Sequence, residues 1–100
     1  MTEMTYAQAA RLGLKEELER DPTVWALGED LGFEGGMAGQ YKDLQAEYGA
    51  DRIVDTPISE ATIMGAAIGA ALAGTRPIAE LRFSDFAMCA VDELVNQAAK

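Results

Sequence analysis

The longest uncharged stretch of the chain, residues 61–75, constrains its fold more than any other feature. It consists almost wholly of small and apolar residues, and it predicts one long helix over residues 59–73 that Gly74 caps. A helix without charged residues must be covered on nearly all sides. Small residues recur along it three or four positions apart and predict close contact with another backbone: Gly65, Ala66, Gly69, Ala70 and Ala73. The chain therefore needs a partner surface, either the rest of a domain or another subunit.

Short apolar segments alternate with helical segments along the chain. Three segments predict strands: Thr23–Leu27, Arg52–Asp55 and Pro77–Phe83. Three more predict helices: one from a capping box at Thr5 to the stop at Asp21-Pro22, Lys42–Tyr48 before Gly49, and one from Ser84 or Asp85 onward. Strands separated by helices form parallel crossovers, so the sequence predicts an α/β sandwich. Three strands are few for such a sheet, which indicates that residues 1–100 are a piece of one larger domain.

Hydrophobic periodicity also predicts which side chains face the core. The first helix should bury Ala7, Ala10, Leu14 and Leu18, and the last should bury Ala87, Val91, Leu94 and Ala98. The strand Thr23–Leu27 has no polar alternation, so we expect it to be covered on both faces. Five glycines between residues 28 and 39 predict a loop with positive φ angles or a close backbone approach.

Composition excludes several classes of function. The chain has 8 Lys and Arg against 17 Asp and Glu, a formal net charge of −9, which argues against binding to nucleic acid or to anionic membranes. With one cysteine, Cys89, and no histidine, the chain excludes an intrachain disulfide, a Cys/His metal site and a Ser–His nucleophile. No secretory or transit signal opens the sequence, and no apolar stretch reaches the about 20 residues of a membrane span. These features predict a cytoplasmic protein without a metal site of its own.

The turn at residues 55–60 carries the most informative chemistry. It joins the carboxyl end of a predicted strand to a helix, which is where open α/β sheets bind ligands. Ser59 is expected to cap the helix and Asp55 to hold the turn. Glu60 falls in the first helical turn, and the local pattern alone favours a plain helix-dipole role for it, worth under about 1 kcal/mol.

Four segments together resemble the β subunit of thiamine-diphosphate-dependent 2-oxoacid dehydrogenases, the family of pyruvate, branched-chain and acetoin dehydrogenases. They are LGED at 27–30, RIVDTPISE at 52–60, GAAIGAALAGTRPIAEL at 65–81 and FSDFAMCAVDELVNQAAK at 83–100. The resemblance covers essentially all 100 residues, but only the first part of the family's transketolase-like pyrimidine-binding domain. Arg82 departs from it, because the family usually has an uncharged residue there.

The resemblance implies roles for five residues. Glu60 is the catalytic carboxyl group that hydrogen-bonds the aminopyrimidine nitrogen of thiamine diphosphate and so promotes loss of the thiazolium proton. Phe86 packs on the aminopyrimidine and Ile58 contacts it, with plain core packing as the alternative for both. Glu29 and Asp92 relay protons between paired active sites, with a solvated charge or a helix cap as the alternative.

The same resemblance implies partners and a reaction. The enzyme is an α₂β₂ heterotetramer with a second β subunit, and its α subunit supplies Mg²⁺ for the cofactor. It decarboxylates a pyruvate-like 2-oxoacid and passes the acyl group to a lipoyl-bearing acyltransferase, while the isolated 100-residue chain is expected to be inactive. Two alternatives stay open: a pyrimidine-binding domain of a transketolase or deoxyxylulose-phosphate synthase, and a non-catalytic fragment that serves subunit assembly.

Overall fold

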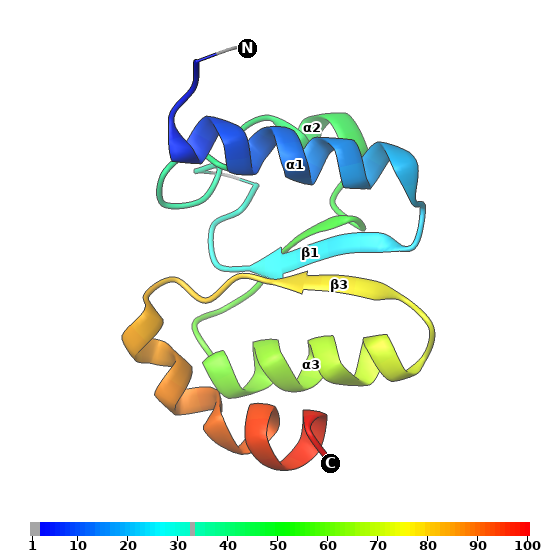
Figure 1. Cartoon of the computed structure of the whole chain (residues 1–100), viewed down its shortest axis with the longest axis vertical. Helices are drawn as coiled ribbons and strands as arrows, with labels where there is room; N and C mark the ends of the chain where they lie inside the picture. The colour runs from blue at the N-terminus through cyan, green and yellow to red at the C-terminus, as the bar shows by residue number, and fades with distance from the viewer. Residues whose placement is uncertain (1–2, 33) are drawn as a thin grey trace.

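A three-stranded parallel sheet separates two helical layers, as Figure 1 shows. The computed structural model describes residues 3–32 and 34–100. Its elements are α1 (Tyr6–Arg20), β1 (Val24–Gly28), α2 (Leu44–Tyr48), β2 (Ile53–Asp55), α3 (Glu60–Leu72), β3 (Arg76–Ala79), a 3₁₀ helix η1 (Ser84–Ala90) and a π-helix η2 (Asp92–Ala98). The predicted α/β architecture with parallel strands is confirmed. None of the helices in these ranges is long and apolar enough to cross a membrane.

Strand β1 is the middle strand of the order β2-β1-β3, and the two layers form separate cores on its faces. Val24 and Ala26 face the α1–α2 layer, whereas Leu27 packs with Ile63 and Ala67 of α3. Side chains alternate between the faces of a strand, so one short strand serves both cores. The first core also contains Leu18, Leu31, Tyr41, Leu44 and Ile53. The prediction that this strand is covered on both faces is confirmed.

Helix α1 begins with the predicted capping box. Gln8 N–H donates to Thr5 Oγ1 at 3.1 Å, and Thr5 N–H donates to Gln8 Oε1 at 2.8 Å. The predicted inward stripe is partly wrong, because Leu18 is buried and Leu14 half-buried but Ala10 is exposed. The amino-terminal half of α1 lies over the loop between β1 and α2, where Arg11 Nε donates to the carbonyl oxygen of Lys42 at 2.8 Å.

The predicted last strand is shorter than expected. β3 ends at Ala79, and Glu80 makes one further bond from its N–H to the carbonyl oxygen of Leu27 at 2.9 Å. Its neighbour β1 ends at Gly28, so the chain beyond Glu80 has no strand to pair with.

The predicted last helix is also different. Residues 84–98 form η1 and η2 in place of one α-helix, and Phe83 occupies the position before the first turn. The side chain of Ser84, a predicted cap, lies outside the part of the chain that the structure describes. Of the predicted buried residues, Val91, Leu94 and Ala98 are exposed, and it is Ala90 that is buried. The two helices differ in residues per turn from an α-helix, so the side chains that face α3 change.

Asp55 holds the loop after β1 rather than the turn at residues 55–60, for which it was predicted. The N–H of Gly32 donates to Asp55 Oδ1 at 2.7 Å, and Gln45 Nε2 donates to Oδ2 at 3.1 Å. The predicted positive φ angles occur in the same loop, at Gly35, Gly36 and Gly39.

Gly28 ends β1 where β3 passes very close. A Cβ at this position would lie 2.7 Å from Glu80 Cβ and 3.2 Å from the Glu80 carbonyl oxygen. We expect Gly28→Ala to lower the free energy of unfolding by about 1–3 kcal/mol, measured by urea denaturation, because the two strand ends must separate. The control Gly13→Ala adds a methyl group on α1 with nothing within 4 Å, and it should stabilise by about 0.5–1 kcal/mol. Equal effects of the two substitutions would contradict the close approach.

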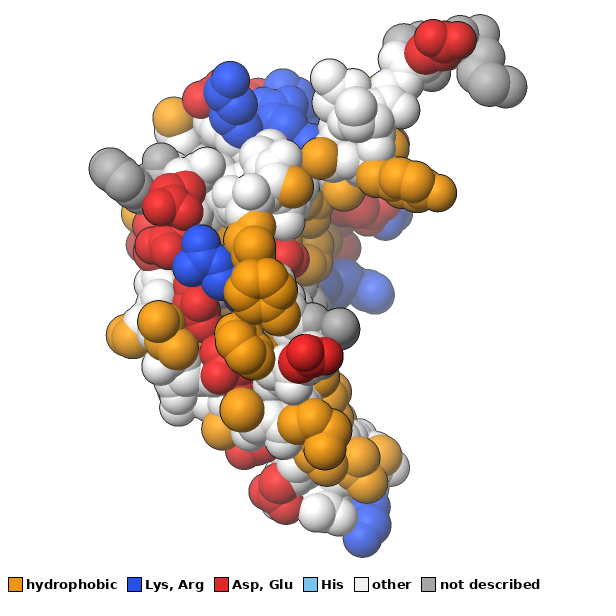
Figure 2. All heavy atoms as spheres, turned by 90° about the vertical axis from the view of Figure 1, so that its left-hand side faces the viewer, with side chains coloured by type: hydrophobic (Ala, Val, Ile, Leu, Met, Phe, Trp, Pro, Cys, Tyr) orange, Lys and Arg blue, Asp and Glu red, His pale blue; other side chains and the backbone are white. Residues whose placement is uncertain are grey.

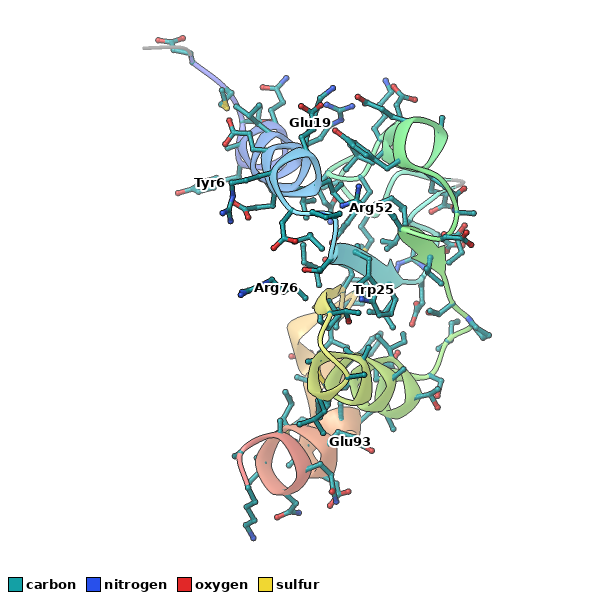
Figure 3. The ribbon with its side chains drawn as sticks, turned by 90° about the vertical axis from the view of Figure 1, so that its right-hand side faces the viewer. Tyr6, Glu19, Trp25, Arg52, Arg76 and Glu93 are labelled. Carbon is teal, nitrogen blue, oxygen red and sulfur yellow. The ribbon has the colours of Figure 1, made fainter. Side chains whose placement is uncertain are left out.

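Arg52 fastens the end of α1 to the start of β1. Its Nη2 donates to the carbonyl oxygens of Leu18, Asp21 and Val24 at 2.8, 3.0 and 2.9 Å. Figure 3 shows Arg52 between α1 and the sheet, whereas Arg76 extends away from the molecule.

Removal of this guanidinium should destabilise the fold. We expect Arg52→Met to lower the free energy of unfolding by about 2 kcal/mol, because half-buried carbonyl groups lose a charged donor. Arg76→Met is the matched control: Arg76 is exposed and forms only a 3.5 Å ion pair with Asp21, so the change should stay within about 0.5 kcal/mol. Urea denaturation of both variants checks the difference.

Candidate active site

The three strands end at one edge of the sheet, and the candidate residues gather there. Gly28 is in register with Asp55 of β2, and Leu27 with Ala79 of β3. The residues that follow therefore leave the sheet side by side. Figure 2 looks at this edge and shows basic side chains among acidic ones, next to hydrophobic side chains that continue toward the carboxyl-terminal segment.

Glu29 is the buried acid of this edge, with 8% of its surface exposed. It follows Trp25 and Leu27 in the alternation of β1, and both of these pack on the α3 side. Its carboxyl group thus lies on the α3 side of the sheet, near enough to Glu60 for that acid to affect its pKa. Burial raises the pKa of Glu29 first and the neighbouring Glu60 carboxyl raises it further, whereas Arg82 opposes the rise.

Glu60 is half-buried and begins α3. Its Oε2 atom is buried and has no hydrogen-bond partner within residues 3–32 and 34–100. The carboxyl group of Glu29, whose pKa is raised, lies beside it. Among the described residues nothing occupies this oxygen of Glu60, so it can accept a bond from a ligand.

The predicted cap at Ser59 is wrong. The hydroxyl of Ser59 hydrogen-bonds Thr62 Oγ1 at 2.8 Å and makes no bond to a backbone N–H of α3. The backbone of Ser59 has φ −169° and ψ 86°. The first N–H groups of α3 are therefore not capped by this side chain, and they add positive potential beside Glu60.

The two predicted apolar contact residues lie near the surface. Ile58, in the turn before α3, is 77% exposed, and Phe86 of η1 is 39% exposed. Phe86 packs edge-to-face on Phe83 with the ring centroids 5.2 Å apart. Plain core packing, the alternative for both, does not describe side chains this open. Their contact with a cofactor stays a prediction.

Asp92 does not share the surroundings of Glu29. It is exposed at the start of η2, and its Oδ1 accepts a hydrogen bond from Asn96 Nδ2 at 2.9 Å. This arrangement matches the alternative of a solvated charge, and the predicted proton relay through Asp92 stays a prediction.

Arg82 is the participant that the sequence did not reveal. Its Nη1 lies 3.0 Å from Asp30 Oδ2 and 3.8 Å from Glu29 Oε2, and its Nη2 lies 3.3 Å from Glu34 Oε2. Arg82 follows β3 and the three acids follow β1, so only the adjacency of these strands brings them together. The sequence marked Arg82 solely as an unusual residue for the family.

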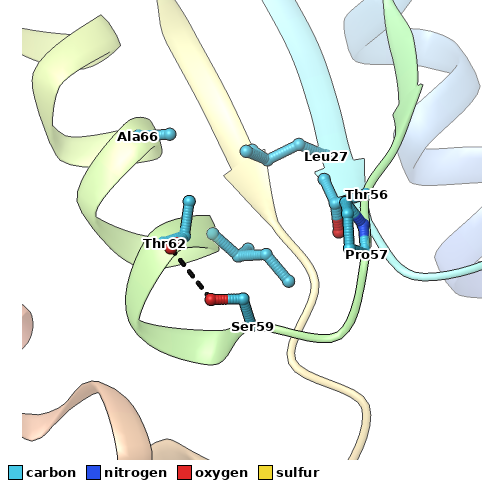
Figure 4. Close-up of a pocket in the computed structure, with 7 residues that line it drawn as sticks. Leu27, Thr56, Pro57, Ser59, Thr62 and Ala66 are labelled. Atoms are coloured by element: carbon cyan, nitrogen blue, oxygen red, sulfur yellow. Dashed lines mark hydrogen bonds between the residues drawn. The ribbon is translucent and has the colours of Figure 1, made fainter.

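An apolar pocket of about 280 Å³ lies beside the turn before α3, as Figure 4 shows. It is lined by Leu27, Thr56, Pro57, Ser59, Thr62, Ile63 and Ala66. Thr56 Oγ1 is buried without a hydrogen-bond partner among the described residues. The sequence did not reveal this pocket, because its lining combines β1 with a turn and a helix that come later in the chain.

Comparison with known proteins agrees with this geometry. The family described as "Transketolase, pyrimidine binding domain" matches residues 2–100. The 2-oxoisovalerate dehydrogenase subunit beta of Bacillus subtilis (strain 168) is 47% identical over 100 residues, which are 100% of this chain and 31% of that protein. The mitochondrial pyruvate dehydrogenase E1 component subunit beta of Rattus norvegicus is 45% identical over 98 residues, which are 98% of this chain and 27% of that protein.

These relatives confirm the resemblance to β subunits of 2-oxoacid dehydrogenases, and the chain spans less than a third of the length of either of them. The family match covers the strand edge, α3 and the carboxyl-terminal segment alike. The chain belongs to the transketolase pyrimidine-binding-domain family.

Proposed function

We propose that this chain is the part of a 2-oxoacid dehydrogenase β subunit that binds the aminopyrimidine of thiamine diphosphate, with Glu60 as the catalytic carboxyl group. The observation that carries the proposal is the buried Oε2 of Glu60, which has no partner in the described part of the chain and lies at the edge where the parallel strands end. Ligands of open α/β sheets bind at this edge. The relatives named as β subunits of 2-oxoisovalerate and pyruvate dehydrogenases support the same class of enzyme.

The residues present fit an aminopyrimidine ring. Such a ring needs a carboxyl group at a ring nitrogen and apolar contacts on its faces. Glu60 offers an oxygen without a partner, while Ile58 and Phe86 offer exposed apolar surface from the turn and from η1, a helix that packs on α3. Glu60 would bind the ring nitrogen and hold a proton there, and Phe86 and Ile58 would orient the ring.

When bound, thiamine diphosphate supplies the electron sink that decarboxylation of a 2-oxoacid requires. The residues of this chain contribute proton control and exclusion of water. Glu29 is buried next to Glu60, so it can exchange a proton with Glu60 without contact with bulk water. Asp92 would extend this relay if a partner subunit brought a further acid to it.

The remaining partners are part of the same proposal. An α subunit would supply Mg²⁺ and the diphosphate site, a second β subunit would complete an α₂β₂ assembly, and a lipoyl-bearing acyltransferase would accept the acyl group. Large apolar side chains on α3, η1 and η2 support contact with such subunits, since Leu72, Met88 and Val95 are 85%, 76% and 56% exposed. Location in the cytoplasm stays a prediction from the sequence.

Replacement of Glu60 tests the proposal directly. In the full-length β subunit assembled with its α partner, we expect Glu60→Gln to lower 2-oxoacid decarboxylation by about 10²–10⁴-fold, because the amide keeps the shape but cannot exchange the proton. Glu93→Gln is the matched control, since Glu93 also has a buried, unpartnered Oε2 but lies on η2 against Gly65. Size-exclusion chromatography checks assembly of each variant. Full activity of an assembled Glu60→Gln enzyme would return Glu60 to a helix-dipole role and favour a subunit that serves assembly alone.

Phe86 gives a second, independent test. We expect Phe86→Ala to weaken thiamine diphosphate binding by roughly 3–10-fold, since an aromatic contact is worth about 0.5–1.5 kcal/mol. Leu12→Ala removes an exposed apolar side chain from α1, in the other helical layer, and it should leave the dissociation constant unchanged. Equilibrium binding monitored by fluorescence quenching measures both, and equal affinities for the two variants would contradict the contact.

A further inference from the structure

Arg82 is held from several sides at the candidate site. Two carboxylates fix its guanidinium, Asp30 Oδ2 at 3.0 Å and Glu34 Oε2 at 3.3 Å, and 26% of the side chain is exposed. Glu29 Oε2 lies 3.8 Å away on the buried side. A planar guanidinium can engage several carboxylates at once, which a lysine ammonium on its flexible chain does less well.

The anchoring matters because of the backbone beside it. Asp30 has a left-handed conformation with φ 56°, which is unfavourable for a residue other than glycine. Its side chain binds Arg82, and its carbonyl oxygen accepts a hydrogen bond from Gly36 N–H at 3.1 Å. Arg82 therefore stabilises the turn that aims Glu29 at the amino-terminal end of α3.

Two acids and one cation affect the pKa of Glu29. It faces Glu60 from α3, Asp30 from its own loop and Arg82 from the segment after β3. Burial, Glu60 and Asp30 all raise the pKa of Glu29, and Arg82 is the group that lowers it. An opposite charge within about 4–6 Å favours the ionised form of a carboxyl group. Loss of this cation should therefore move proton uptake by Glu29 to higher pH.

We propose that Arg82 is a positioning residue that holds Glu29 against Glu60 and supplies the positive charge that balances this carboxyl pair. It acts through Glu29 and touches no reacting atom. The effect of Arg82 on the pKa of Glu29 does not depend on the proposed function. Its importance for catalysis does, because it rests on the role proposed for Glu60. The family resemblance assigns no such role, because the matching position is usually uncharged there.

The experiment follows protonation of Glu29 in the assembled enzyme without cofactor. The infrared carbonyl stretch of protonated carboxyl groups is recorded against pH, and the contribution of Glu29 is the difference from Glu29→Gln. We expect Arg82→Gln to raise the midpoint by roughly one pH unit. Arg82→Lys keeps the charge and should restore most of the shift. Arg76→Gln removes an exposed arginine that pairs with Asp21, and it should leave the midpoint unchanged.

The midpoint alone decides the inference. A midpoint in Arg82→Gln equal to that of the parent protein would overturn it, even if the variant had a lower melting temperature. A shift in Arg82→Gln that Arg82→Lys does not reverse would overturn the charge role as well. The proposed function is tested separately by the activity of Glu60→Gln, so the two can fail independently.

Discussion

The structure depends on the position of β1 between β2 and β3. Both neighbours pair with it in parallel, so all three strands end at the same edge, and the chain leaves them at adjacent points. Gly28 makes this arrangement possible, because a side chain there would collide with Glu80. A shift of one residue in the register of β1 would turn Glu29 away from α3 and direct it into the other core.

At the candidate site, two neighbouring carboxyl groups are opposed by the positive charge of Arg82 and of the amino-terminal end of α3. Glu29 and Glu60 bring two acids together where solvent is largely excluded from one of them, and this raises the pKa of Glu29. The amino-terminal end of α3 and the guanidinium of Arg82 offset part of that cost. A carboxyl pair under such opposing influences is suited to hold and pass a proton, which is the chemistry that the proposed function requires.

The layer of α3, η1 and η2 leaves large apolar side chains exposed, whereas the α1–α2 layer buries most of its own. Tyr41, Leu31 and Leu44 are almost fully buried in the first core, whereas the buried members of the second core among the described residues are the smaller set Leu27, Ile63 and Ala67. Phe86, Met88 and Val95 are exposed on the same side. This openness agrees with the need for a partner surface that the uncharged helix predicts, and the chain spans less than a third of the length of these relatives.

Sequence alone determined the order of the elements, the capping box at Thr5, the burial of β1 on both faces and the place of Glu60 at the head of α3. These features are local, because periodicity, caps and turn residues act within one or two helical turns or along one strand. Only the tertiary structure decided that Glu29 meets Glu60, that Arg82 binds Asp30 from 52 residues away, and which side chains of residues 84–98 face α3. Strand order and register create those contacts, and they depend on the packing of the whole sheet rather than on any segment of the chain.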